Sequence, residues 1–338
     1  MSFKNILIRS DGSNDIGLGH ITRCLTFANY LKKKKINSTF VTSTNEISEV
    51  VLNSGFNCIF LERDDEIRHL QRISLSLNTN IIIIDTDYNR VFPSKEAYYI
   101  HVDKLRDESF FIVSFDDMWS ANVNSNIVVI PYLGAEKIKI RNTSSRHLLG
   151  EKYFLLRNEF LCKPNFIVRR KIKRILITMG GSDPEKITLR AIKSIRDTNL
   201  KVKVTVLIGK FSKITRREIF ALSNGNLNIL HNTSNISELM LNCDIAITNS
   251  GLTKYELSAL GVPYIVISDN LYQKTLMEDF SKKCVSIHVG MFSNITTKKL
   301  SQSIVNLSTN YSKRVELSTN GKRFIDGHGI DRLYSEIF

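Results

Sequence analysis

The sequence is poor in cysteine, proline and tryptophan, with five, five and one of them in 338 residues. The five cysteines are odd in number and widely spaced, and no two form a CxxC pair, which argues against a disulfide framework and against a cysteine-based zinc site. This use of cysteine fits a reducing compartment, so we expect a cytoplasmic protein. We attribute the low proline content and the many Asn, Ile and Lys residues to nucleotide bias in the genome rather than to disorder.

Long apolar runs are also missing. The longest candidate, residues 81–84, is far shorter than the ~18 residues that a membrane-spanning helix needs. Residues 1–6 lead directly into a strand-like apolar run and lack the layout of a signal peptide. We therefore expect no stable association with a membrane.

Acidic residues are scarce relative to basic ones, with 33 Asp and Glu against 47 Lys and Arg and a formal charge of +14. Residues 1–160 hold 20 basic and 19 acidic side chains, so the excess belongs to residues 161–338, which hold the other 27 and 14. Such a charge raises the hypothesis of a nucleic-acid partner. However, the basic residues are not interleaved with aromatic ones, and no zinc-finger, basic-zipper or RNA-binding signature occurs. We expect an anionic small molecule as the partner, and no nucleic acid.

Short apolar runs rich in β-branched residues recur along the chain, separated by segments long enough for helices. Near-continuous runs of this kind indicate parallel strands that are covered on both faces. The runs are residues 6–8, 39–41, 58–61, 81–84, 110–115 and 127–130, and then 175–178, 202–208, 227–230, 245–248, 264–267 and 285–289. The pattern restarts after the basic segment 169–174, which predicts an α/β fold with two doubly wound, Rossmann-like domains.

A glycine-rich loop follows the first predicted strand, where residues 9–20 read RSDGSNDIGLGH. Gly17 and Gly19 permit tight turns and a close approach of the backbone to a ligand, and free N–H groups at the start of a helix favour anions. The glycine spacing is not that of a dinucleotide fingerprint.

His20 ends this loop, at the carboxyl end of the first strand, where open α/β sheets bind ligands. A neutral imidazole there can take a proton from water, and Asp11 or Asp15 could orient it. The alternative is a histidine that caps its own helix. We favour the functional interpretation because of the loop that precedes it.

Two further loops follow strands in the second half. Residues 175–184 read ILITMGGSDP, and the amides of Gly180, Gly181 and Ser182 could meet a phosphate; an ordinary turn between strand and helix explains them equally well. Residues 248–256 read TNSGLTKYE, a small-residue turn before a helix whose amide end could hold a diphosphate.

The second of these loops contains Ser250, Gly251, Leu252 and Thr253. Glu256 follows on the helix, where its carboxylate could accept both hydroxyls of a ribose, although an isolated carboxylate on a helix is usually a solvated one. Residues 267–273 follow the next strand, and their polar groups, Asn270 and Gln273 among them, would lie at the same edge of the sheet.

Carboxylates also end two strands of the first half, in residues 84–89 and 114–117. Asp116 and Asp117, like Asp85 and Asp87, could bind a metal, but no further ligands stand at a recognisable spacing. Helix caps or loop-ordering residues explain them better, and we expect no metal site.

Together, these motifs resemble the PseG family, the UDP-sugar hydrolases of pseudaminic acid biosynthesis, and equally the related spore-coat polysaccharide proteins. The resemblance is carried by six blocks that occur in the family's order across nearly the whole chain. They are residues 9–25, 114–117, 153–160, 179–183, 250–263 and 326–332.

The resemblance implies a GT-B fold like that of the MurG glycosyltransferase, with a nucleotide-sugar in the cleft between the two domains. It implies the removal of UDP from UDP-2,4-diacetamido-2,4,6-trideoxy-altrose by water. His20 matches the family's catalytic histidine, and Glu256 matches the ribose-binding glutamate of MurG-like enzymes. We place Arg9, beside the glycine loop, among the residues that bind the sugar.

One departure from the family concerns the strand that ends in Asp85. The family often has Asp-His-Tyr or Asp-Ser-Tyr there, whereas this chain has Asp-Thr-Asp-Tyr-Asn at 85–89. Either Tyr88 is displaced by one residue, or Asp87 replaces the tyrosine. The identity of the bound sugar depends on which is true.

We divide the chain into residues 1–160, which carry the His20 loop, residues 161–315, which bind the nucleotide, and residues 316–338, a C-terminal helix that returns toward the first domain. We expect a monomer or a weak oligomer.

For the reaction we expect hydrolysis without a metal or other cofactor and with inversion at the anomeric carbon. Backbone amides of the two loops in the second half would stabilise the departing UDP, and His20, assisted by Asp11, would activate water. A MurG-like glycosyltransferase is the alternative enzyme. A nucleotide-sugar sensor without activity is also possible, but it would leave His20 unexplained.

Overall fold

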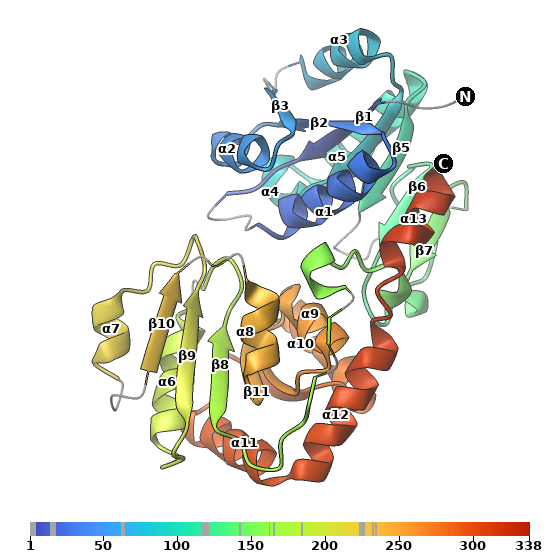
Figure 1. The fold of residues 1–338 in the computed structure, drawn as a ribbon. Helices are drawn as coiled ribbons and strands as arrows, with labels where there is room; N and C mark the ends of the chain where they lie inside the picture. The colour runs from blue at the N-terminus through green and yellow to red at the C-terminus, as the bar shows by residue number, and fades with distance from the viewer. Residues whose placement is uncertain are drawn as a thin grey trace. The chain divides into compact units, whose positions relative to one another are not determined.

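The computed structural model describes residues 5–13, 18–61, 65–115, 122–141, 143–161, 163–164, 166–183, 185–222, 227–231, 233 and 235–338. The chain divides into two compact units (Figure 1). Unit 1 comprises Met1–Leu155 and His328–Phe338, and unit 2 comprises Leu156–Gly327. The division falls a few residues before the predicted boundary at 160.

Over the described residues, unit 1 is built on a seven-stranded sheet of order β3-β2-β1-β4-β5-β6-β7, with every neighbouring pair parallel. The strands are β1 (Asn5–Ser10), β2 (Asn37–Thr42), β3 (Asn57–Phe60), β4 (Ile81–Asp85), β5 (Phe111–Phe115), β6 (Ile127–Ile130) and β7 (Arg146–Leu149). The helices are α1 (Gly19–Lys33), α2 (Asn45–Asn53), α3 (Glu66–Leu77), α4 (Tyr88–Val91), α5 (Lys95–Asp107) and α13 (Gly329–Ile337), with the 3-10 turns η2 (Ala135–Lys137) and η3 (Glu151–Tyr153).

Hydrophobic periodicity explains the packing of unit 1. The isoleucines of β4 are buried on both faces of the sheet, as expected for a parallel strand covered by helices. Helix α1 buries Ile21, Cys24, Ala28 and Leu31, which repeat at the spacing of one helix face. These side chains share one core with the inner residues of the sheet.

Unit 2 repeats the same architecture with a six-stranded parallel sheet of order β10-β9-β8-β11-β12-β13 over the described residues. Its strands are β8 (Arg174–Thr178), β9 (Lys203–Ile208), β10 (Leu227–His231), β11 (Ile245–Asn249), β12 (Tyr264–Ser268) and β13 (Ile287–Met291). The helices are α6 (Ile187–Arg196), α7 (Arg216–Phe220), α8 (Ile236–Asn242), α9 (Thr253–Leu260), α10 (Leu271–Lys282), α11 (Thr297–Thr309) and α12 (Tyr311–Phe324), and the 3-10 turn η4 (Asn158–Phe160) precedes β8.

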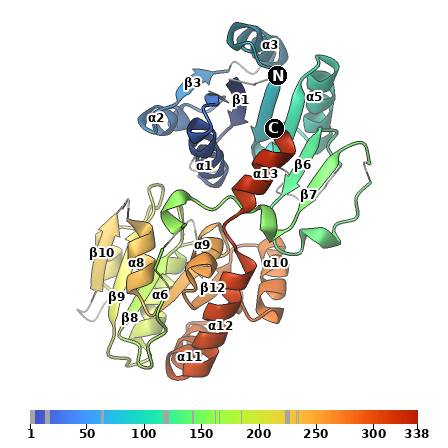
Figure 2. The same ribbon diagram turned by 45° about the vertical axis from the view of Figure 1, so that its right-hand side comes forward.

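The C-terminal segment belongs to both units, but the return is shorter than predicted. Helix α12 packs on α9 so closely that a Cβ at Gly321 would lie 2.9 Å from the backbone oxygen of Ser258, so it is part of unit 2. Only His328–Phe338 joins unit 1, where α13 lies beside β7 (Figure 2). There the Tyr30 hydroxyl donates to Asp331 Oδ1 at 2.7 Å.

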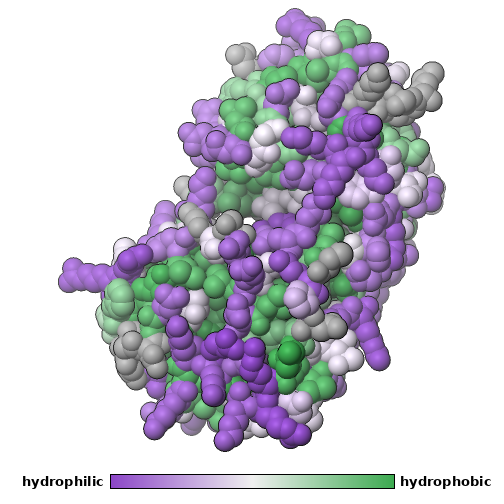
Figure 3. Space-filling view, in the orientation of Figure 1, coloured by the Kyte–Doolittle hydropathy of each residue, from purple (hydrophilic) through white to green (hydrophobic). Residues whose placement is uncertain are grey.

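All twelve apolar runs that predicted strands lie on strands β1 to β6 and β8 to β13. The sequence did not predict β7, a four-residue edge strand that begins with an exposed arginine. Polar side chains are dense at the lower edge of Figure 3, over the part of unit 2 that holds α11 in Figure 1. None of the helices in the described ranges combines the length and apolar composition that a membrane crossing requires.

Candidate functional site

In unit 1 the carboxyl ends of β1 and β4 lie side by side at the point where the strand order reverses. Strand β1 pairs with β2 on one edge and with β4 on the other, and Ser10 stands in register with Asp85. Open α/β sheets bind their ligands at such a switch point. Helix α1 begins at Gly19, which puts His20 in its first turn, next to the end of β4.

Asp85 is the carboxylate that holds His20. The distance from His20 Nδ1 to Asp85 Oδ1 is 2.7 Å. Arg23, one turn further along α1, donates two hydrogen bonds to the same carboxylate, from Nε to Oδ2 at 2.7 Å and from Nη2 to Oδ1 at 2.6 Å. Arg23 is fixed in turn, because it donates to the Tyr132 hydroxyl at 2.6 Å and lies 4.5 Å over the ring of Phe115.

The electrostatics of this cluster keep Asp85 charged. Burial alone would raise the pKa of Asp85, but the charges of Arg23 and His20 outweigh burial and lower it to about 2. An ionised carboxylate only accepts hydrogen bonds, so the hydrogen of a neutral His20 lies on Nδ1 and the lone pair on Nε2. The His20 side chain is 12% exposed, whereas Asp85 is fully buried. This is the arrangement of a general base with an orienting carboxylate.

The expectation that Asp11 assists His20 is wrong. Asp11 is buried, and its carboxylate accepts hydrogen bonds from Arg9 Nη1 at 2.5 Å, from the Ser43 amide at 2.8 Å and from the Thr86 hydroxyl at 3.2 Å. Arg9 is also buried and donates through Nε to Glu66 at 2.7 Å. These two residues tie β1 to its neighbouring loops, so the proposed substrate contact by Arg9 does not fit its position either.

The other candidate site residues of unit 1 lie either outside the described residues or at the start of α4. Gly17 and Asp15 lie outside the described residues, as do Asp116 and Asp117. Asp87 caps α4 by accepting from the Asn89 amide at 3.2 Å. Tyr88 is buried and stacks on Tyr98, with ring centroids 5.3 Å apart. Tyr88 is thus a buried residue and Asp87 the more exposed of the two, and which of them takes the place of the family's tyrosine stays open.

No group of three or more His, Cys, Asp and Glu side chains within the described ranges is close enough together to hold a metal ion.

In unit 2, the three loops singled out from the sequence meet at one edge of the sheet. Strand β11 lies between β8 and β12, so the loops that follow these strands are neighbours. A Cβ at Gly180 would lie 3.7 Å from the Thr253 hydroxyl. The Ser250 hydroxyl donates to Gln273 Oε1, which links the loop after β11 to the start of α10.

The loop after β8 is a tight turn packed against another loop. Gly180 has a φ of +73°, a conformation that favours glycine. A Cβ at Gly209 would lie 2.1 Å from the carbonyl oxygen of Gly180, and the Phe211 amide donates to the carbonyl of Gly181 at 2.9 Å. Ser182 is half-buried next to this turn.

The helix that follows this turn is already capped. The Asp183 carboxylate accepts from the amides of Ile187 at 2.8 Å and Thr188 at 2.9 Å, the first residues of α6. The start of α6 therefore holds a protein carboxylate. The contact of a phosphate with the amides of Gly180, Gly181 and Ser182, which precede this cap, stays a prediction. What the turn offers a ligand is its own backbone.

Helix α9 differs in this respect. It begins at Thr253, directly after the loop, and no side chain of the described residues caps its first turn, which follows Leu252. Lys254 is buried and donates to the carbonyls of Ser250 at 2.5 Å and Gly251 at 3.1 Å, so those carbonyls are bound from inside. The sequence did not predict this role for Lys254. The start of α9 keeps its amides and its positive dipole end for an anion.

The loop after β12 completes this edge. Asn270 caps α10 by accepting from the Gln273 amide at 2.9 Å, and Gln273 Oε1 also accepts from the Asp269 amide at 2.9 Å. Asp269 Oδ1 is buried and has no hydrogen-bond partner among the described residues. Burial and the charge of Asp183 raise the pKa of Asp269 to about 6. Asn270 and Gln273 therefore order the loop.

Glu256 is buried on α9, and its Oε1 accepts from Arg157 Nε at 2.7 Å. Arg157 lies in the block 153–160, one of the six that carry the family resemblance, but the sequence indicated no partner for it.

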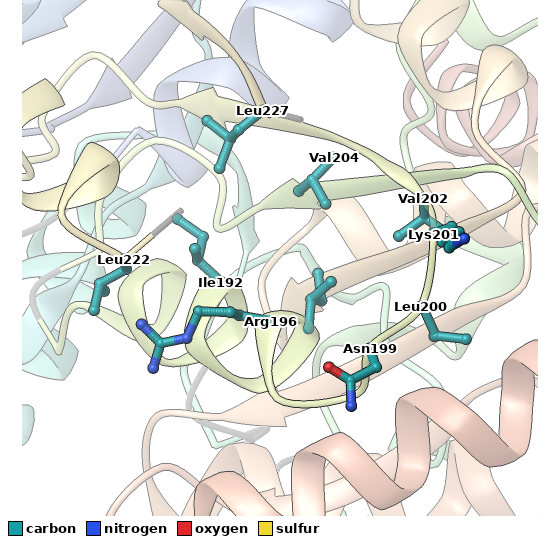
Figure 4. Close-up of a pocket in the computed structure, with 10 residues that line it drawn as sticks. Ile192, Arg196, Asn199, Leu200, Lys201, Val202, Val204, Leu222 and Leu227 are labelled. Carbon is teal, nitrogen blue, oxygen red and sulfur yellow. The ribbon is translucent and has the colours of Figure 1, made fainter. Parts of the chain in front are cut away.

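A separate cavity of about 400 Å³ lies at the opposite edge of the unit 2 sheet (Figure 4). Apolar side chains, among them Ile192 of α6, Val202 before β9 and Leu227 at the start of β10, form most of its lining, and Arg196, Asn199 and Lys201 complete it. These positions mark the amino ends of the strands, so the cavity is not part of the candidate site.

Comparison with solved structures identifies the architecture. MurG of Acinetobacter baumannii is similar with a TM-score of 0.69 and 12% identity, over 99% of both chains. The spinosyn rhamnosyltransferase SpnG complexed with thymidine diphosphate has a TM-score of 0.71 and 10% identity, over 99% of this chain and 100% of that one. The fold is GT-B. Residues 174–330, nearly all of them in unit 2, also match the glycosyltransferase family 28 C-terminal domain, in agreement with the predicted fold class.

Two curated relatives match the chain in sequence. Uncharacterized protein MJ1062 of Methanocaldococcus jannaschii is 28% identical over 302 residues, which are 84% of this chain and 60% of that protein. The spore coat polysaccharide biosynthesis protein SpsG of Bacillus subtilis is 21% identical over 336 residues, 96% of this chain and 95% of that protein. The chain thus spans 60% of the length of the first relative. The resemblance to spore-coat polysaccharide proteins is confirmed, and that to the PseG family stays a prediction.

Proposed function

We propose that this protein hydrolyses a UDP-sugar, removing UDP from a UDP-2,4-diacetamido-2,4,6-trideoxyhexose of the altrose type in pseudaminic acid biosynthesis. The observation that carries the proposal is the His20–Asp85 pair. A histidine held by a buried, ionised carboxylate at the strand switch point of a GT-B unit is equipped to take a proton from a nucleophile.

In the proposed step, His20 Nε2 accepts a proton from water while the water oxygen bonds to the anomeric carbon. The bond from that carbon to the β-phosphate oxygen breaks, and its electron pair leaves with UDP. Attack from the face opposite the leaving group inverts the anomeric centre. Asp85 stabilises the imidazolium that forms, as a carboxylate close to a histidine does in acyl-transfer enzymes.

Unit 2 supplies what the leaving group needs. The uncapped first turn of α9 and the adjacent backbone of Leu252 and Thr253 would offer amides to the diphosphate. The Gly251 amide, which donates to Asn249 Oδ1 at 3.3 Å, would exchange that partner for a phosphate oxygen. The carboxylate of Glu256 accepts ribose hydroxyls. These amides neutralise developing charge without a metal, so we expect turnover to persist in EDTA.

A glycosyltransferase is the second candidate, and the solved structures favour it, since SpnG is a rhamnosyltransferase with the same fold. In that case His20 would deprotonate an acceptor hydroxyl instead of water. The two functions share the nucleotide site and differ only in the nucleophile.

The deciding experiment follows the sugar by NMR in H₂¹⁸O, with the purified chain, the UDP-sugar and no acceptor. A hydrolase releases UDP and free hexose at a steady rate and puts ¹⁸O on the anomeric carbon of the hexose. A transferase is almost silent without an acceptor. Appearance of ¹⁸O in UDP would show attack at phosphorus and would exclude the proposed step.

The His20→Asn variant separates chemistry from binding. We expect it to lose nearly all sugar release while its affinity for UDP stays within about twofold of the wild type, because the proposed nucleotide contacts are those of unit 2. Near-normal turnover in a folded His20→Asn protein would remove His20 from the mechanism.

A further inference from the structure

We infer that Arg157 is a positioning residue that holds the Glu256 carboxylate in place to bind the ribose. It thereby sets the preference of the site for ribonucleotides over deoxyribonucleotides. The inference rests on the proposed function, in which Glu256 accepts ribose hydroxyls. Arg157 would not touch the nucleotide itself. It would act only through the carboxylate.

The geometry shows how tightly Arg157 is held. Its Nε donates to Glu256 Oε1 at 2.7 Å, and its Nη1 lies 2.8 Å from Glu159 Oε1. The guanidinium also lies 4.8 Å over the ring of Phe160. One planar group therefore bridges two carboxylates and stacks on an aromatic ring, a combination that only arginine provides.

The second carboxylate is itself anchored. Glu159 Oε2 accepts from the amide of Ser237, in the first turn of α8, at 3.3 Å. Helices α8 and α9 pack against each other, and η4, which carries Glu159, packs on α9. The bridge therefore runs from the start of α8 through Glu159 and Arg157 to Glu256 on α9. Its two ends are fixed by the fold.

This bridge leaves one carboxylate oxygen for a ligand. Arg157 takes Oε1 of Glu256, and Oε2 has no partner among the described residues. A carboxylate with one oxygen fixed by a guanidinium presents its other oxygen in a defined direction, which lowers the entropy cost of accepting a hydroxyl.

Arg157 also compensates the negative charges of Glu256 and Glu159. Burial opposes the charged form of Arg157, but Glu256 and Glu159 outweigh it and raise the pKa of Arg157. Without the guanidinium, the carboxylates of Glu256 and Glu159 would keep no positive charge between them. The loss of Arg157 would therefore remove both the group that fixes the direction of the Glu256 carboxylate and the charge that compensates it.

The test compares the Kd of UDP with that of 2′-deoxy-UDP by calorimetry, in the wild type and in the Arg157→Gln, Arg157→Lys, Glu256→Gln and Arg169→Gln variants. Arg169 is the matched control, because it also pairs with a buried carboxylate in unit 2, that of Asp244 at 2.8 Å, but before the start of β11, at the other edge of the sheet. The ratio of the two Kd values isolates the ribose contact, which a general loss of folding does not change.

We expect the wild type to prefer UDP at least about tenfold, as a charge-assisted hydrogen bond allows. Arg157→Gln should lower the preference below about threefold while the Kd of 2′-deoxy-UDP stays within about twofold, and Arg169→Gln should leave the ratio unchanged. Arg157→Lys keeps the positive charge but lacks the planar guanidinium, so its preference for UDP over 2′-deoxy-UDP should fall at least threefold. This variant tests the role of Arg157 if Arg157→Gln does not fold.

The two failures are distinct. If the wild type shows no preference and Glu256→Gln changes nothing, the ribose contact of the proposed function is absent. If the wild type discriminates, Glu256→Gln abolishes the discrimination and the Arg157 variants retain it, then Glu256 reads ribose without help and the role of Arg157 is overturned.

Discussion

Replacement of Asp85 by asparagine tests the candidate base through the group that orients it. The change keeps the shape of the side chain and exchanges one accepting oxygen for a donating NH₂. If the NH₂ takes the place of Oδ2, it faces the Arg23 Nε donor, and if it takes the place of Oδ1, it faces both Arg23 Nη2 and His20 Nδ1. Neither orientation satisfies all three donors, because the native carboxylate accepts from all of them.

The orientation with NH₂ toward His20 has a further effect on the base. His20 then accepts at Nδ1 and carries its hydrogen on Nε2, the tautomer that cannot take a proton from water at that nitrogen. A change of this kind in the Ser-His-Asp triad of serine proteases costs about 10⁴ in kcat, and general-base assistance is worth roughly 10²–10⁴ overall. We expect Asp85→Asn to lower kcat by about 10²–10⁴ and to change KM little.

The same substitution lowers stability. Asp85 and Arg23 are both buried, and removal of one partner of a buried ion pair costs about 3–5 kcal/mol. In a unit of this size that corresponds to a fall in Tm of roughly 6–20 °C. Activity should therefore be measured well below the Tm of the variant and expressed per folded molecule, with the folded fraction taken from circular dichroism.

Asp103→Asn is the control for this experiment. Asp103 is a half-buried carboxylate of unit 1 that lies on α5 and accepts from Asn124 at 2.8 Å, so its loss removes a hydrogen bond without touching His20. We expect its kcat to match the wild type. A folded Asp85→Asn enzyme with a kcat within threefold of the wild type would refute the argument that Asp85 orients the base.

Three further predictions concern stability and the nucleotide edge. The pKa of Asp85 is about 2 in the folded protein, below the value of 3.8 for an unperturbed aspartate. The ionised Asp85 therefore adds roughly 2 kcal/mol to the free energy of unfolding above pH 4, and this stabilisation is lost as the pH falls toward 2. Acid unfolding of Asp85→Asn should lack this pH-dependent component. Asp183→Ala should lower stability by about 1 kcal/mol in urea unfolding without weakening UDP binding, because the proposed diphosphate site does not use the start of α6; a large loss of affinity would contradict this. Gly209→Ala should cost about 1–3 kcal/mol and weaken UDP binding, because its Cβ would lie 2.1 Å from the Gly180 carbonyl; an unchanged Tm would show that the turn can move.

Most of the fold could be predicted because parallel strands covered on both faces need near-continuous apolar runs, and such runs are visible without an alignment. Strand β7 could not be predicted, since an edge strand of four residues with an exposed arginine has no such signature. The C-terminal return is shorter than predicted for a related reason. Helices α12 and α13 both bury apolar side chains, and only the contacts of Gly321 with α9 and of Asp331 with Tyr30 show which unit each one covers.

The site is harder to predict because its partners are set by strand register rather than by spacing. The glycine loop points to His20, but the carboxylate that holds it comes from 65 residues away and depends on the pairing of β1 with β4. Asp11, closer in sequence, is directed into the network of Arg9 instead. The sequence did contain a signal for the partner of His20, since Asp85 ends the strand that pairs with β1. The switch point of a doubly wound sheet brings those two strand ends together.

The two glycine turns of unit 2 look alike in sequence, and the structure separates them by a single carboxylate. Each follows a strand and precedes a helix, so each could hold a phosphate at a helix start. After β8 the helix begins late and Asp183 binds its first amides, so an anion there would compete with a fixed carboxylate. After β11 the helix begins at once, and Lys254 binds the carbonyls of the turn from within. The Gly251 amide donates to Asn249 Oδ1 at 3.3 Å, but no described side chain caps the first turn of α9. We therefore expect a diphosphate to gain more at α9 than at α6. The turn of Gly180 and Gly181 would contribute backbone close to Thr253 of α9 rather than a helix dipole of its own.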